Sequence, residues 1–115
     1  MAPDDSRATL ERARSLFNAG AYWAAHEALE TVWRSIIREP ERCVWQGLIQ
    51  AAAALLHRER GNRHGVAAVG GSALAKLAGA QLPEVEFETV HFRAQLARAL
   101  AGEGDPPRLE FRSDA

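Results

Sequence analysis

The sequence contains little that would mark a secreted, membrane-bound or nucleic-acid-binding protein. Cys43 is the only cysteine, so no disulfide can form within the chain, which fits a reducing compartment. The longest apolar run near the middle, AAAALL at residues 51–56, is too short to span a bilayer. The first residues, MAPDDSRATLERAR, lack the apolar core of a signal peptide. We therefore expect a soluble cytoplasmic protein with no membrane partner.

An excess of one charge is also missing. The 115 residues include 14 basic and 15 acidic side chains, and the formal net charge is -1. Such a balance leaves no broad basic surface for DNA or RNA, so no nucleic-acid partner is expected. The chain also lacks a phosphate-binding glycine loop, a nucleophile elbow and a dinucleotide-binding fingerprint. No enzyme class is identified by these features.

Strand-like alternation is absent as well, and helical periodicity takes its place. Alanine and leucine dominate, and the apolar residues recur at helical spacing. Glycine and proline fall where such helices should end, as at Gly20, Pro40 and Gly61. Asp5 and Ser6 form a good N-cap pair for the first helix. The pattern predicts five helices, at about residues 7–18, 22–38, 41–60, 63–77 and 85–101.

The connections between the first four predicted helices are only a few residues long. Short connections favour antiparallel neighbours, so we expect an all-α compact bundle of about five helices. A chain of this length suits a single helical domain at 1–115, with its core at 7–101 and an irregular tail at 102–115. Gly65, Gly70 and Gly71 in the fourth predicted helix indicate close helix approach over small residues. The alternative is that they leave room for a ligand or a partner subunit.

A polar face interrupts the expected apolar pattern of the second helix. The stretch AHEALETVWR, residues 25–34, places His26, Glu30 and Trp33 at i, i+4 and i+7. A helix in a small bundle would normally carry only apolar residues there. The third predicted helix repeats this anomaly along one stripe, at Gln46, Gln50 and His57. If the two helices face each other, these side chains form one polar seam.

Two interpretations of this seam remain open. In the first, it is a closed hydrogen-bond network that fixes helix register, because unpaired buried polar groups are costly. In the second, it is a site, since carboxylate–histidine clusters are a recurring way to build sites in helical bundles. The catalytic candidates are then Glu27, Glu30 and His26. The further ligand-binding candidates are Trp33, Arg34, Gln46, Gln50, His57 and Asn62.

Metal binding is one form of the second interpretation. A zinc protease motif needs two histidines four residues apart with a glutamate between them, and Glu30 stands in place of the second histidine. The spacing still allows His26 and Glu30 to bind one divalent metal ion, with His57 as a third ligand. The cofactor is then a divalent metal, whereas the closed network needs none. Glu88 and His91 form a single Glu-x-x-His motif, which we interpret as a solvated helix face.

The turn RGNRHG, residues 60–65, is the second place to look for a site. Gly61 suits the C-terminal cap of one helix, and Asn62 suits the N-cap of the next. Those structural roles account for both residues. The alternative is an anion bound by Arg60 and the start of the following helix.

Three segments taken together resemble one family. They are FNAGAYWAAHEALETVWR at 17–34, WQGLIQAAAALLHRERGN at 45–62, and the glycine- and alanine-rich helix that follows. Their combined pattern is similar to that of the DUF309 family of small all-helical proteins. The pair Tyr22–Trp23 departs mildly from it, where a single aromatic followed by a polar residue is expected. The matching residues are Asn18, Gly20, His26, Glu27, Glu30, Trp33, Arg34, Gln46, Gly47, Gln50, His57, Gly61, Asn62 and Gly65.

The resemblance implies an all-helical fold and makes the polar face a feature of the family, but it supplies no reaction. Our first functional hypothesis is a small-ligand or metal-binding protein centred on the seam. The alternative is a non-enzymatic helical interaction module, in which the seam is a structural hydrogen-bond network. A homodimer formed through a helix face would suit either hypothesis.

Overall fold

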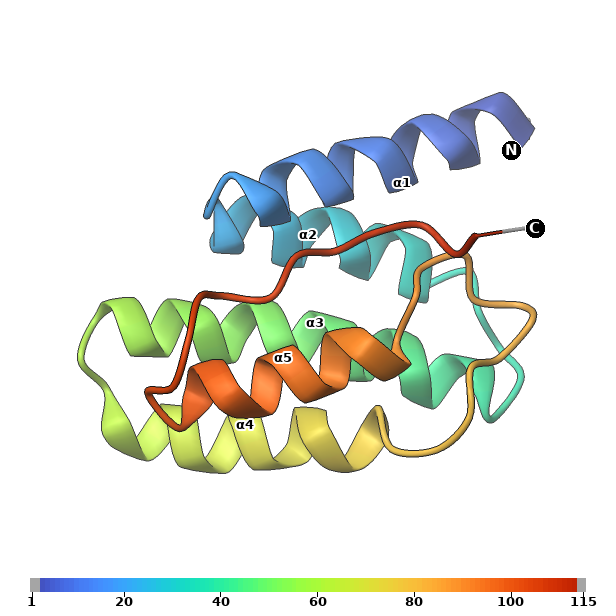
Figure 1. Ribbon diagram of the computed structural model, residues 1–115. Coiled ribbons are helices and arrows are strands. Elements are labelled where there is room, and N and C mark those ends of the chain that lie inside the picture. Colours follow the sequence, from blue (N-terminus) through green and yellow to red (C-terminus); the bar gives the residue numbers. More distant parts are fainter. Residues whose placement is uncertain (1–2, 114–115) are drawn as a thin grey trace.

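The protein is an all-α bundle, as the sequence predicts (Figure 1). The computed structural model describes residues 3–113. Within that range the β-type pairing is limited to a single antiparallel bridge between Phe87 and Phe111. None of the helices in it combines the length and apolar character that crossing a bilayer requires. The five helices are α1 (Pro3–Asn18), α2 (Tyr22–Trp33), α3 (Glu41–Glu59), α4 (Arg63–Lys76) and α5 (Val90–Leu100).

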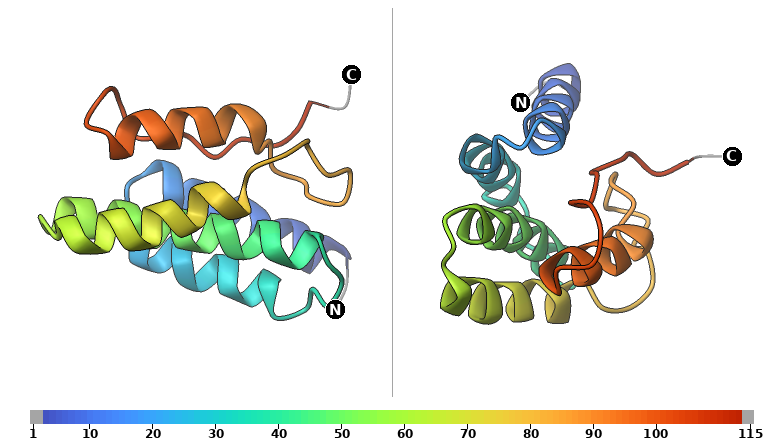
Figure 2. Two further views of the ribbon diagram at one scale, coloured as in Figure 1. Left: turned by 90° about the horizontal axis from the view of Figure 1, so that it is seen from below. Right: turned by 60° about the vertical axis from the view of Figure 1, so that its left-hand side comes forward.

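The first four helices follow one another as antiparallel neighbours and form an arc (Figures 1 and 2). In this arc α3 packs most extensively on α4 and then on α2, while α1 packs on α2. The helix α5, the 77–89 connection and the C-terminal segment lie on the inner side of the arc (Figure 2). The molecule therefore has an outer face, made by α1 to α4, and an inner face that later parts of the chain cover.

The core lies on the inner side of the arc. Phe17 at the end of α1 is 1% exposed, and its ring contacts the rings of Tyr22 and Phe92 at centroid distances of 5.3 and 5.5 Å. The predicted stripe of α1, Leu10, Ala13 and Phe17, is buried in full. Residues outside the helices also complete the core, namely Val85, Phe87 and Leu109.

Helix α2 is shorter than predicted, ending at Trp33 instead of residue 38. The guanidinium of Arg42 explains the early end, because its Nη1 donates to the Ile36 carbonyl at 2.7 Å and to the Trp33 carbonyl at 3.4 Å. These carbonyls are therefore satisfied without a further helical turn. Helix α1 is longer than predicted. It begins at Pro3 instead of residue 7, because proline suits the first turn of a helix.

Helix α5 begins at Val90, not at residue 85 as predicted. The preceding segment is extended: the Glu88 amide donates to the Glu110 carbonyl, and the Arg112 amide donates to the Glu86 carbonyl, both at 2.8 Å. The Glu88 carboxylate then accepts from the backbone amides of His91 and Phe92 at the start of α5. The Glu88–His91 motif is thus explained by a helix cap.

Two of the three glycines of α4 allow close packing, as predicted. A Cβ atom at Gly65 would lie 2.5 Å from the His57 ring, and one at Gly70 would lie 2.7 Å from Leu100. Gly71 differs, because a Cβ there would meet no atom within 4 Å. The caps at the preceding turn are also confirmed, since Gly61 has a φ of 70° and the Asn62 side chain accepts from the Gly65 amide.

Candidate functional site

The polar face of α2 is centred on a histidine–carboxylate pair. His26 and Glu30 are one helical turn apart, and His26 Nδ1 lies 3.0 Å from Glu30 Oε1. The other carboxylate oxygen, Oε2, lies 3.6 Å from Nη2 of Arg34, whose side chain is largely in solvent. The side chains of His26 and Glu30 are 22% and 30% exposed, so the pair lies at the surface and not in a closed core.

Two ring nitrogens on this face lack a regular hydrogen bond. Nδ1 of His26 is close to Glu30, but its geometry falls short of a hydrogen bond, and Nε1 of Trp33 has no partner at all. Both atoms are buried. Trp23, which is 60% exposed, stacks on the His26 ring with an interplanar angle of 3°, and the Arg42 guanidinium lies 3.9 Å above the Trp33 ring. An aromatic ring therefore covers the His26 ring, and a guanidinium covers the Trp33 ring.

The predicted residues of α3 turn toward α4, not toward the α2 pair. Gln50 Oε1 accepts from the Ser72 hydroxyl at 3.0 Å, and that hydroxyl accepts from Lys76 at 2.8 Å. His57 Nδ1 lies 3.1 Å from the Asn62 amide nitrogen. Among residues 6–113, no hydrogen bond or ion pair joins His26 or Glu30 to Gln46, Gln50 or His57. The predicted seam is thus divided into separate groups.

The metal-ligand candidates are divided in the same way. Across the described part of the chain, no three His, Cys, Asp or Glu side chains are grouped so that they could hold one metal ion. His26, Glu30 and His57 are therefore not assembled as a three-ligand centre. Glu27 is exposed on the outer side of α2, and Gln46 is half-buried on α3.

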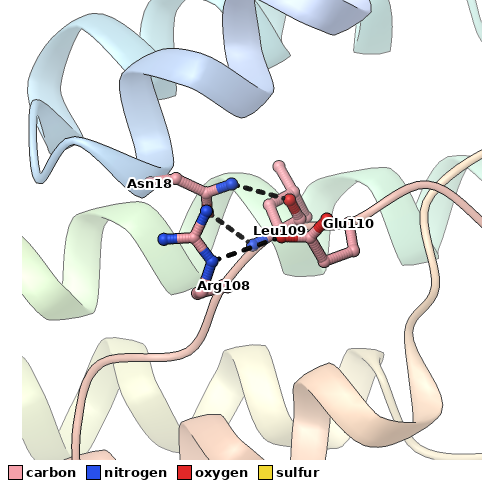
Figure 3. A network of polar contacts seen from close by, with 4 residues as sticks. All are labelled: Asn18, Arg108, Leu109 and Glu110. Atoms are coloured by element: carbon pink, nitrogen blue, oxygen red, sulfur yellow. Dashed lines mark hydrogen bonds and ion pairs between the residues drawn. The ribbon is translucent and has the colours of Figure 1, made fainter.

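Two amide side chains with extensive bonding were not identified as such from the sequence. Asn18 binds the backbone of Leu109 in both directions, with its Nδ2 donating at 2.9 Å and its Oδ1 accepting at 2.7 Å (Figure 3). An ion pair of 3.3 Å between Arg108 and Glu110 flanks this contact (Figure 3). The sequence pattern predicted only that Asn18 lies near a helix end. Its partner is 91 residues away, so no local signal reveals the contact.

Gln81 holds the 77–89 connection by the same type of contact. Its Nε2 reaches the carbonyls of Leu82, Val85 and Phe87 at 2.9–3.3 Å. Its Oε1 accepts from the backbone amide and the hydroxyl of Thr89, which is 3% exposed. The glutamine is therefore the central polar contact of an irregular segment that carries buried apolar residues.

Comparisons with known proteins agree with the resemblance found in the sequence. The family model "Domain of unknown function (DUF309)" matches residues 10–69. A relative from Aquifex aeolicus (strain VF5), named "Uncharacterized protein", is 33% identical over 104 residues, which are 89% of this chain and 31% of that protein. The chain thus spans about a third of the relative's length. No solved structure matches it. The chain belongs to the DUF309 family.

Proposed function

We propose that the face of α2 carrying His26, Glu30 and Trp33 binds a small polar ligand or a divalent metal ion. The observation that carries the proposal is the pair of buried ring nitrogens without a regular hydrogen bond, His26 Nδ1 and Trp33 Nε1. Most buried polar atoms in proteins have a partner, so an atom without one has capacity for a bond to water or to a ligand. Glu30, at 3.0 Å from the first of them, adds a carboxylate to the same face.

The polar side chains on α3 and the turn after it differ from those on this face of α2. The side chains of Gln50, His57 and Asn62 have hydrogen-bond partners within the protein that explain their presence. The partners of His26 and Trp33 are incomplete. Capacity for further bonds therefore remains on this face of α2 and not at Gln50, His57 and Asn62.

A metal ion fits the spacing of the pair. Two neighbouring ligand atoms on an ion with bonds of about 2.1 Å are roughly 3.0 Å apart in octahedral geometry and roughly 3.4 Å apart in tetrahedral geometry. His26 Nδ1 and Glu30 Oε1 are 3.0 Å apart, so both could bind one ion whose other ligands are water or a substrate. Rotation of the exposed Trp23 side chain would uncover the histidine. We propose binding at this face and no reaction. The chain has a single cysteine, which fits a reducing compartment, so we also propose a cytoplasmic location.

The test is a metal and ligand titration of protein purified without a histidine tag. His26→Ala removes the proposed ligand, and His64→Ala removes an exposed histidine from α4 as a matched control. We expect Zn²⁺ or Mn²⁺ to bind the native chain and the control at one ion per chain, and to be lost from His26→Ala. Circular dichroism should show native helicity in both variants. Equal binding by all three proteins would contradict the metal form.

Ligand binding without a metal has its own readout. A fragment library followed through the three tryptophan indole resonances should move the Trp33 signal in the native chain. The same fragments should leave that signal unmoved in Glu30→Gln, which keeps the shape of the side chain and removes its charge. If no fragment and no ion affects Trp33 or His26, the proposal is wrong.

The alternative function, an interaction module, is supported by a different observation. Trp23 and Ile37 are large apolar side chains that are 60% and 84% exposed, on α2 and just beyond it. They lie near opposite ends of α2, a 12-residue helix roughly 18 Å long, so a partner that contacts both must extend along the helix. If a second copy binds there, the double variant Trp23→Ala/Ile37→Ala should abolish self-association in sedimentation experiments. A native chain that stays monomeric at high concentration would exclude the homodimer.

A further inference from the structure

A groove lies between α4 and the C-terminal end of α5. Its volume is about 830 Å³, and α3 separates it from the α2 pair (Figure 2). It follows α4 from Arg63 to Leu74, which is roughly 17 Å along the helix axis. Its floor on α4 is made by small or apolar residues, namely Val66, Ala67, Gly70, Gly71 and Leu74. The groove is long enough to contact about three turns of another helix.

Gly71 in the floor of this groove is not explained by packing within the chain. Gly70 lets the Leu100 side chain approach, because a Cβ atom there would lie 2.7 Å from it. A Cβ atom at Gly71 would meet no atom within 4 Å, and the residue does not have the positive φ that favours glycine. Glycine is a poor helix former, so its place inside α4 weakens the helix. A second backbone that approaches over Gly71 would make the missing side chain useful.

The exposed side of α4 along the groove also lacks charge. Residues 65–75 contain no charged side chain, and the exposed positions among them are Ala67, Ala68, Gly71 and Ala75. Helix α1 at the other edge of the arc differs, since its exposed positions include Arg7, Glu11 and Arg12. A surface helix usually carries charged and polar residues on its solvent side. The exposed side of α4 therefore has the composition of a contact surface, whereas that of α1 is typical of a solvated helix.

The charges that line the groove are positive and lie at one end. Arg58 and Arg63 line it at the turn between α3 and α4, and none of its described lining residues is acidic. Nη1 of Arg58 donates to the Ala99 carbonyl at 3.2 Å, which holds the guanidinium beside the end of α5. Arg63 is exposed, and within the part of the chain whose side chains are described it forms no ion pair. Carboxylates of a partner at this end would pair with both guanidinium groups.

The shape and charge of the groove favour a polypeptide of another protein. Arg63, Ala67 and Gly71 are exposed, so the groove is open along α4, whereas sites for small ligands enclose most of the ligand surface. A second copy of this chain fits less well. Two α4 helices side by side would bring basic ends together in either orientation, since Arg63 and Lys76 lie at the two ends and the helix holds no carboxylate between them.

We propose that this groove binds an amphipathic helix of a partner protein, with small apolar residues along one face and carboxylates at one end. The carboxylates would pair with Arg58 and Arg63, and the apolar face would pack over Ala67 and Gly71. This surface is separate from the α2 site, so binding here does not depend on the ligand proposed there.

The test uses two synthetic helical peptides of about 15 residues as probes. Both carry alanine and leucine along one face, and the first turn holds glutamates in one peptide and lysines in the other. We expect the glutamate peptide to bind with a Kd on the order of 0.1 mM, because the contact is smaller than a standard protein interface. The lysine peptide should bind at least about tenfold more weakly. In ¹⁵N-labelled protein the amide signals of Gly70 and Gly71 should shift, and that of His26 should not.

A pair of variants locates the contact. Gly71→Leu fills the groove and should weaken binding of the glutamate peptide by at least about tenfold. The same variant should raise the Tm by roughly 4 °C, because leucine is the better helix former and its Cβ atom meets no neighbour. A loss of binding is then not a loss of folding. Ala68→Leu adds the same side chain at an exposed position outside the groove and should bind as the native chain does.

A second pair of variants tests the charge. Arg63→Glu should weaken the glutamate peptide and strengthen the lysine peptide, each by about tenfold. Arg12→Glu, which reverses an exposed charge on α1, should change neither. Absence of binding by the glutamate peptide, or equal binding by Gly71→Leu and Ala68→Leu, would overturn the proposal. A native dimer that Gly71→Leu makes monomeric in sedimentation, or decanoate binding more tightly than the peptide at Gly71, would overturn it as well, in favour of a second copy or a small anion.

Discussion

The molecule uses polar side chains in two ways, which the amides Asn18 and Gln81 and the ring nitrogens of His26 and Trp33 represent. Each amide bonds through both its donor and its acceptor, and apart from the Thr89 hydroxyl every partner is backbone of a distant or irregular segment. Nδ1 of His26 is buried beside the Glu30 carboxylate, Nε1 of Trp33 is buried as well, and neither has a regular hydrogen bond. Amides with complete bonding explain the fold, whereas side chains with unused bonding capacity are where a ligand is to be sought.

The largest loss of stability is expected for Gln81→Ala. The change leaves the buried Thr89 amide and several carbonyls without partners, which should lower the free energy of unfolding by about 3 kcal/mol. In a domain of this size the loss corresponds to a fall in Tm of roughly 12 °C by calorimetry. Gln95→Ala is the matched control, a half-buried glutamine of α5, and should change Tm little. A fall no larger than that of the control would show that Gln81 is not a scaffold residue.

Asn18→Ala should have the next largest effect. It removes both bonds to Leu109, a buried core residue of the C-terminal segment, and should cost about 2 kcal/mol. Hydrogen exchange gives the specific readout, because the Leu109 amide should lose its protection. Asn18→Asp keeps the acceptor for that amide and should retain part of the protection. Unchanged exchange at Leu109 in the alanine variant would contradict the contact.

These two residues also show what the sequence could and could not predict. Helical periodicity and turn residues predicted the all-α fold and the caps at Gly61 and Asn62, because those signals are local. The predicted C-terminal end of α2 and the predicted start of α5 were wrong, because Arg42 and Gln81 bind backbone groups through contacts outside the helices. Tertiary bonds of this kind leave no periodic trace.

The candidate site was predicted in its parts but not in its assembly. The pairing of His26 with Glu30 follows from their i, i+4 spacing. The expected contact of this pair with Gln50 and His57 is absent. Helical periodicity places residues on one face of a helix, but it does not say which neighbouring helix that face contacts. The nearness of Glu41 to Glu84 and Glu86 had no sequence signal, since only the fold brings these carboxylates together.

Trp33→Phe tests whether the indole N–H of Trp33 stabilises the fold or is available to a ligand. The variant keeps the aromatic ring under Arg42 and removes the unpartnered N–H, so stability should stay the same or rise by up to about 1 kcal/mol. Any ligand that bonds to this N–H should bind more weakly, as measured by calorimetric titration. A large loss of stability would instead show that the indole N–H has a structural partner, and the contrast with Asn18 and Gln81 would disappear.

The smallest effect is expected for Glu41→Gln, and it depends on pH. Burial and the charges of Glu84 and Glu86 raise the pKa of Glu41 above its ordinary value of 4.5, so the folded chain holds this proton more tightly than the unfolded chain does. Stability therefore falls as pH rises from 4.5 through the folded pKa. Glutamine cannot ionise, so the variant should gain roughly 1–2 °C in Tm at neutral pH and nothing near pH 4.

The control for this comparison is Glu103→Gln, which removes one exposed carboxylate from the C-terminal segment. Its Tm should follow that of the native chain at every pH, whereas the Glu41→Gln curve should separate from the native curve only above the ordinary carboxyl range. A gain that is equal at pH 4 and pH 7 would show that packing, not charge repulsion, is responsible.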